Sequence, residues 1–244
     1  MILALAGATI WYIDYNSHDN KYKRANLCFS EGKTSKAIDI LTKLAEEDYT
    51  KAKLRLGLLY LVNDSVELNS EVGLKFLKEV AVSDSIALKT LLRIFLGVPC
   101  KGENLSNNEQ AIYYSNMAIK KGICLSEAYF TLGNVYSNKN DYESAFYYWS
   151  LASEYGSASA YGNLGWMYYW GVGCKENSAK AYMYFMKAYE INPNDDFVLL
   201  YLGLMHFYGY GIEKDVLKGK AFIRRAAELG NDEAKKEYVK QVMQ

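Results

Sequence analysis

Residues that could do chemistry are few in this sequence, and their spacing matches no catalytic arrangement. The two histidines are His18 and His206. Neither pairs with a serine or cysteine and a carboxylate in a known local signature, and there is no P-loop and no H-E-x-x-H motif. Adjacent carboxylates point to different sides of a helix, so they fit helix ends better than acid–base catalysis; they are Glu46-Glu47, Asp195-Asp196 and Asp232-Glu233. We therefore predict that the chain is not an enzyme and has no catalytic residue.

The cysteines also give no sign of a bound metal. They are Cys28, Cys100, Cys124 and Cys174, none of them in a C-x-x-C pair and none at the spacing of a zinc site. We expect them to be small hydrophobic residues or free thiols, and two disulfides are the alternative if the protein is exported. The prediction is no metal and no cofactor.

The composition argues against nucleic acid as a partner. Lys plus Arg and Asp plus Glu each total 28, so the net charge is zero, and no basic run stands out. Half of the 244 residues are hydrophobic, which is enough for a continuous core. Only two are proline, which suits a mostly helical chain with short connections.

The N-terminal stretch is apolar and uncharged. Residues 1–13 read MILALAGATIWYI, shorter than the roughly 20 residues that cross a bilayer and without the positive start of a signal peptide. Three interpretations stay open: a degenerate export signal or anchor, a buried helix, or a disordered leader. The run has no polar face, which favours the first, with N-terminal membrane association and a bacterial envelope or periplasmic location over the cytoplasm. Residues 14–20 are expected to be a polar linker.

A pattern that recurs about every 36 residues is the strongest signal in the chain. In the first half of each repeat an anchor leucine is followed by glycine, at Leu56-Gly57, Leu132-Gly133, Leu164-Gly165 and Leu202-Gly203, with Leu91-Leu92 in the second repeat. Four residues after the anchor stand Tyr60, Phe95, Tyr136, Tyr168 and His206. Offsets of four share a helix face. Because mid-helix glycine costs about 1 kcal/mol, we infer that a partner helix approaches closely there.

The second half of each repeat carries its own periodic positions. A small residue stands at Gly73, Ala111, Ala145, Ala181 and Gly219. Three residues later comes an aromatic one: Phe76, Tyr114, Tyr148, Tyr184 or Phe222. We expect that ring to pack beside the small residue of a helix pair. Eleven residues after the small residue stand Asp84, Gly122, Gly156, Asn192 and Gly230, all tolerant of a left-handed helix stop.

A hairpin of similar size precedes the repeats, and a single helix follows them. The expected first pair is residues 22–29 and 36–47, and residues 231–244 form one more amphipathic helix with charges on its outer face. The predicted organisation is an apolar segment at 1–15, a tetratricopeptide-like hairpin at 16–50, five repeats at 51–230 and a capping helix at 231–244. Turns between helices are expected at the glycine pairs Gly171/Gly173 and Gly209/Gly211, and at residues 138–141.

At these positions the chain resembles the Sel-like repeat family, whose pattern is roughly A-x-x-x-L-G-x-x-Y-x-x-G-x-G-V followed by K-A-x-x-W/Y-x-x-x-A-A-x-x-G. Residues 157–193 and 195–230 match best, and the resemblance covers about residues 20–244. It implies an all-α fold, a right-handed α-solenoid of stacked antiparallel helix pairs (a tetratricopeptide/Sel-like superhelix), without catalytic residues. The chain departs from the pattern at Leu92, Val98, Cys100 and His206, which leaves the second repeat the most irregular.

The resemblance also implies a binding groove, because the first helices of such repeats usually line the concave side. Rotation about these helices places an apolar and aromatic stripe there, including Gly162 and Leu200. Exposed apolar surface marks interaction sites, and asparagine amides can bind a peptide backbone. The partner-binding candidates are Phe130, Asn134, Asn163, Trp166, Tyr169, Trp170, Leu204 and Phe207. The alternative is that much of this stripe is core, since each helix also contacts neighbouring repeats.

The predicted function is a protein-binding adaptor or scaffold that holds another protein or a peptide in this groove. Two alternatives stay open: a bacterial immunity or inhibitor protein that neutralises a toxin or enzyme by direct binding, and an envelope-anchored regulator. The sequence identifies neither the partner nor the oligomeric state.

Overall fold

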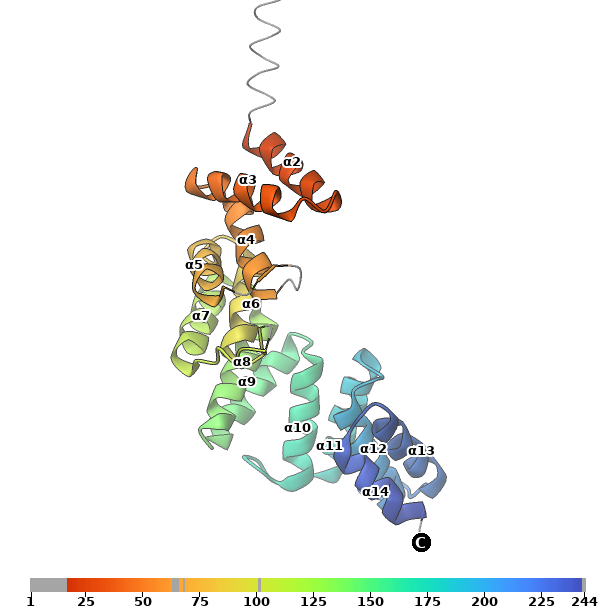
Figure 1. Ribbon diagram of the computed structural model, residues 1–244. Coiled ribbons are helices and arrows are strands. Elements are labelled where there is room, and N and C mark those ends of the chain that lie inside the picture. Colours follow the sequence, from red (N-terminus) through yellow and green to blue (C-terminus); the bar gives the residue numbers. More distant parts are fainter. Residues whose placement is uncertain (1–16, 63–65, 68, 101, 243–244) are drawn as a thin grey trace, which may run out of the picture. The chain divides into compact units, whose positions relative to one another are not determined.

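The protein is an all-α helical repeat structure. The computed structural model describes residues 17–62, 66–67, 69–100 and 102–242, and over these the chain forms thirteen helices and no strand (Figure 1). The apolar run 1–13 and residues 14–16 of the expected linker 14–20 lie outside the described residues. Ser17 caps the first described helix by accepting from the Asn20 N–H, so that helix begins inside the expected linker.

Two compact units divide the chain, residues 1–107 and residues 108–244. In unit 1 each helix packs on the next; the helices are α2 (His18–Ser30), α3 (Thr34–Glu46), α4 (Thr50–Val62), α5 (Ser70–Val80) and α6 (Ser85–Phe95). The α2/α3 pair is the first hairpin expected from the sequence. The second predicted repeat, residues 85–122, has its two helices in different units, and the predicted domain boundaries stay a prediction.

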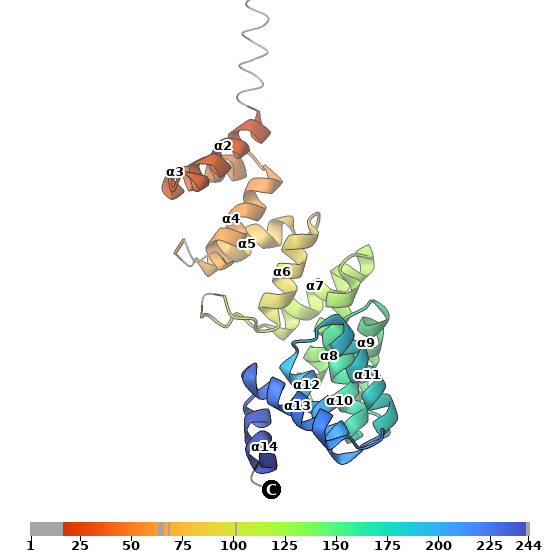
Figure 2. The same ribbon diagram turned by 90° about the vertical axis from the view of Figure 1, so that its right-hand side faces the viewer.

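Unit 2 contains the best-matching repeats. Its helices again pack on their chain neighbours: α7 (Asn108–Lys121), α8 (Leu125–Asn138), α9 (Tyr142–Glu154), α10 (Ala158–Trp170), α11 (Ser178–Ile191), α12 (Asp196–Tyr208), α13 (Val216–Glu228) and α14 (Asp232–Val242). Helices α10 and α12 also touch directly. Figures 1 and 2 show α12, α13 and α14 side by side at the end of the chain, where the sequence predicts a capping helix.

Mid-helix glycines let paired helices approach closely, as inferred. A Cβ built on Gly165 would lie 2.7 Å from the Phe185 ring, and one on Gly203 would lie 3.1 Å from the Gly219 carbonyl oxygen. Gly57 meets Leu77 and Gly133 meets Trp149 in the same way. The side chain that fills this space stands four residues after the small residue of the second helix, not three. The recurring aromatic, three residues after the small residue, therefore does not fill the space beside the mid-helix glycine.

The aromatic at the third position instead stacks on the ring four residues after the anchor leucine. Tyr136 stacks on Tyr148 at 5.3 Å between centroids, Tyr168 on Tyr184 at 5.5 Å and His206 on Phe222 at 5.8 Å. Their interplanar angles are 13°, 9° and 14°. The same geometry in three successive hairpins explains why both positions recur in phase. His206 takes the tyrosine's place in the stack.

The helix-stop position is only partly as predicted. Gly122, Gly156 and Gly230 have φ of 67°, 77° and 109°, in the left-handed region. Asp84 has φ −120° and instead caps α6, accepting from the Ile86 and Ala87 N–H groups. Asn192 ends α11 in an extended conformation with φ −131°. Aspartate is a favoured N-cap residue, so at Asp84 the same repeat position begins the next helix.

All four cysteines are free thiols, with Cys28 and Cys100 buried. No cluster of three or more potential metal ligands lies within the described residues. A search of the same residues finds no helix long and apolar enough to span a membrane.

Candidate protein-binding surface

The ends of α10 and α12 present aromatic side chains to solvent. Both helices stop at a left-handed glycine, Gly171 with φ 67° and Gly209 with φ 78°. The last helical residue, six after the anchor leucine, is Trp170 in α10 and Tyr208 in α12. Their exposed fractions are 56% and 47%. A solvated helix face normally carries charge, so rings this exposed at equivalent positions of two repeats mark a candidate interaction site.

These rings belong to one contiguous aromatic cluster in unit 2. Tyr169 lies at its centre, edge-to-face with ring centroids 5.0 Å from Trp170, 5.3 Å from Tyr201 and 5.9 Å from Tyr210. Tyr208 stacks on Tyr210 at 5.5 Å. Pairs of this geometry attract, so each ring holds its neighbour in place. We call the exposed rings of Trp170, Tyr208 and Tyr210 the aromatic surface.

Polar atoms of this cluster are bonded within the fold. Trp170 Nε1 donates to the Tyr201 hydroxyl at 3.4 Å, and the Tyr208 hydroxyl donates to Glu237 Oε1 of α14 at 3.1 Å. Burial, and after it the neighbouring Tyr210, raises the pKa of Tyr169 to about 12. Burial and Glu237 raise the pKa of Tyr208 as well. Both phenols are therefore neutral near pH 7, and the surface offers rigid, uncharged rings.

The repeats that form this surface identify the family of the chain. The model of the Sel1 repeat matches residues 101–123, 126–157, 158–192 and 198–231, just over half of the chain. The chain belongs to the Sel1 repeat family. No curated protein matches it. Sel1 repeat proteins are in general protein-interaction scaffolds, and their fold is typically non-catalytic.

Solved Sel1 repeat structures share the fold. One is c5321, a protective antigen of uropathogenic Escherichia coli, with a TM-score of 0.73 and 22% identity over 93% of this chain and 49% of that chain. Another is a Sel1 repeat protein from Oxalobacter formigenes, with a TM-score of 0.72 and 21% identity over 93% of this chain and 66% of that chain. This chain thus spans about half of the first and about two thirds of the second, and the likeness shows the fold alone.

The predicted binding residues divide into two groups in this Sel1 fold. Tyr169 and Trp170 come together in the aromatic cluster. Others pack mainly inward: Phe130 lies against the core around Leu164, Leu204 against the core around Leu202, and Trp166 against both. Asn134 is committed to the fold, because its Oδ1 accepts from Trp149 Nε1 at 2.9 Å. Asn163 and Phe207 are half-buried, Phe207 edge-to-face with Tyr208.

Gly162 and Leu200, which rotation about the helices assigned to the open stripe, are buried. The next Sel1 repeat covers Gly162, since a Cβ there would lie 3.4 Å from Val198. The apolar stripe is therefore part of the core at Gly162 and Leu200, and it is exposed only at the ends of α10 and α12.

Three residues of the cluster, Tyr201, Tyr208 and Tyr210, are absent from the partner-binding candidates selected from the sequence. Tyr210 lies between Gly209 and Gly211, both with positive φ, so a tight turn holds its ring at the surface with 46% of it exposed. An aromatic residue between two turn glycines is a signal that could have been used. Tyr201 is buried and becomes visible only when α10 and α12 are brought together.

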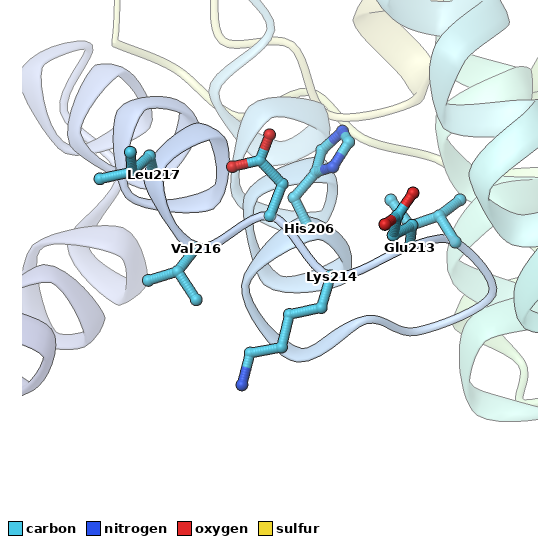
Figure 3. Close-up of a pocket in the computed structure, with 7 residues that line it drawn as sticks. His206, Glu213, Lys214, Val216 and Leu217 are labelled. Atoms are coloured by element: carbon cyan, nitrogen blue, oxygen red, sulfur yellow. The ribbon is translucent and has the colours of Figure 1, made fainter.

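His206 lies beside a surface hollow of about 630 Å³, formed with the loop that leads into α13 (Figure 3). Its ring is 94% buried, its Nε2 lies 3.5 Å from the Tyr182 hydroxyl, and its Nδ1 has no partner. The other residues lining the hollow are Ile212, Glu213, Lys214, Asp215, Val216 and Leu217. None of these is a nucleophilic serine or cysteine. The His206 ring packs within the repeat, stacked on Phe222 and edge-to-face with Tyr182.

Replacing His206 by tyrosine, the residue of the family pattern, is expected to reduce the acid sensitivity of folding. Burial, then the charge of Lys218, lowers the pKa of His206 below its ordinary 6.5, although Asp215 opposes this. Below pH 6.5 the unfolded chain therefore binds more protons than the folded one, and the free energy of unfolding falls until native His206 is protonated as well. Urea denaturation of both proteins between about pH 7 and pH 5 measures the slope. Equal slopes would contradict this account.

Proposed function

We propose that this protein is a non-enzymatic Sel1 repeat scaffold that holds a partner protein or peptide on the aromatic surface of unit 2. The observation that carries the proposal is the exposure of Trp170, Tyr208 and Tyr210 as one contiguous, rigid group. Tryptophan and tyrosine are the residues that dominate binding energy in protein interfaces, because they bury a large area at little entropic cost.

The position of these rings supports the same function. They stand at the ends of α10 and α12, which the tightly packed glycine turns hold in place. The central Tyr169 and the buried Tyr201 form the floor beneath them. In this proposal Phe130, Trp166 and Leu204, which are partly buried against the repeat cores, stabilise the repeats rather than contact the partner.

Site-specific photo-crosslinking tests the proposal. A photoreactive phenylalanine derivative placed at Tyr210 keeps an aromatic ring on the surface and is activated in cells of the native host. We expect a defined protein adduct from this position. The matched control is the same derivative at Tyr147 of α9, which is exposed to a similar extent, 59%, but touches only Tyr148 among the rings of the described residues.

An adduct at Tyr210 and none at Tyr147 would support the scaffold function. Adducts of the same partner at both positions, or none at Tyr210, would count against it. The partner's own activity then separates a scaffold from an inhibitor: a scaffold leaves it intact, whereas an immunity protein abolishes it on binding.

A further inference from the structure

Basic side chains cover the aromatic rings of unit 2 at many places. Lys180 lies 5.1 Å from the centroid of Tyr168, Lys139 lies 5.7 Å from Tyr136 and Lys218 lies 6.0 Å from Phe222. These are the rings of the stacked pairs described above. An ammonium group at such a distance is attracted by the negative face of the ring. Each of these three stacked pairs thus already has a cation from its own chain.

The aromatic surface lacks such a cation. Within the described residues, no lysine or arginine lies over the rings of Trp170, Tyr208 or Tyr210, although all three are about half exposed. Tyr208 and Tyr210 are stacked on each other, and Trp170 lies edge-to-face with Tyr169. Among the described residues the aromatic surface therefore has no cation–π partner, in contrast to the three stacked pairs above.

The charges next to this surface have the matching sign. Glu237 Oε1 accepts from the Tyr208 hydroxyl at 3.1 Å, and Lys240 also contacts this carboxylate, at 3.2 Å from its Oε2. Glu176, in the turn after α10, acts electrostatically on Tyr169. Glu237 remains 15% exposed beside the rings. Glu176 and Glu237 thus place negative charge beside the rings, and Lys240 offsets that of Glu237. Rings flanked by carboxylate favour a guanidinium group, which can stack flat on a ring while donating hydrogen bonds at its edge.

We propose that the aromatic surface binds an arginine-bearing segment of the partner protein, with the guanidinium groups stacked on Trp170, Tyr208 and Tyr210. The inference rests on the proposed function and specifies the chemistry of the partner. It also accounts for the exposed position of these rings, since a cation–π acceptor must be open to solvent before binding.

Peptide binding to the full-length protein tests the inference. The probes are two Gly/Ser peptides of equal length, one with arginine and one with neutral citrulline at the same positions. Binding is followed by NMR or by fluorescence anisotropy. We expect the arginine peptide to bind about 5-fold more tightly. Trp170→Leu/Tyr210→Leu, which keeps apolar bulk but removes the ring faces, should abolish this difference. Tyr147→Leu should retain it, because Tyr147 is an exposed ring outside the aromatic surface.

Three results would overturn the inference: equal binding of the two peptides, a preference for arginine that survives in the double variant, or no binding of either peptide. Thermal melts of each variant distinguish loss of a contact from loss of folding. If photo-crosslinking at Tyr210 captures a partner whose contacting segment holds no arginine, the proposed function stands and this inference fails.

Discussion

Phe185→Ala is expected to lower the free energy of unfolding by about 3–5 kcal/mol. Phe185 is fully buried where α10, α11 and α12 meet. Its ring covers Gly165 of α10 and stacks on Tyr201 of α12 at 5.3 Å with an interplanar angle of 9°. Truncation removes the contacts of three helices at once and leaves a cavity that none of them can close alone.

Urea denaturation followed by circular dichroism measures this loss. Tyr147→Ala is the matched control, because its ring is exposed and its removal should change stability by no more than about 0.5 kcal/mol. A loss below about 1 kcal/mol for Phe185→Ala would show that the hairpins do not depend on this contact.

Combining Phe185→Ala with Gly165→Ala tests whether the Phe185 ring occupies the space beside Gly165. In the wild-type background, the methyl group added at position 165 meets the Phe185 ring. In the Phe185→Ala background the ring is gone, so the same methyl group has free space. The two losses in unfolding free energy should therefore be less than additive.

The repeat in the sequence predicts the fold because it records contacts between neighbouring helices. Leu164, Gly165 and Tyr168 recur with the period of one hairpin, and in the structure each meets the same kind of neighbour as its equivalents. A glycine inside a helix lowers the stability of that helix, so its recurrence at one position indicates that a neighbouring helix needs the space. The left-handed turns at Gly171 and Gly209 follow equally from residue type.

Other features depend on how each helix is rotated about its axis, which the spacing of residues in the sequence does not determine. Tyr184 and Phe185 are adjacent, and only the helix rotation decides that Phe185 covers Gly165 while Tyr184 stacks on Tyr168. Asp84 stands at the same repeat position as Gly122 but caps the next helix, because its carboxylate accepts from the Ile86 and Ala87 N–H groups.

The candidate surface was predictable only in part. Rotation about α10 selects Trp166, Tyr169 and Trp170 together, but the adjoining repeats bury the inner part of the stripe and leave its end exposed. Tyr210 joins the surface through the turn that follows α12, and Glu237 joins it from α14. Contacts between residues about 30 or more positions apart need the helices to be placed first.

The second large effect is expected on the affinity for the partner protein. Trp170→Leu/Tyr210→Leu should weaken capture of the crosslinked partner at least about 30-fold, because buried aromatic anchors in interfaces contribute about 2 kcal/mol or more. Its unfolding free energy should stay within about 1 kcal/mol of wild type, since both rings are about half exposed.

The dissociation constant of that partner, measured for the wild type, for this double variant and for Tyr147→Leu, is the most direct test of the central claim. The account predicts a large loss for the double variant alone, at unchanged stability. Equal affinity of the wild type and the double variant would show that the partner binds elsewhere on the repeats.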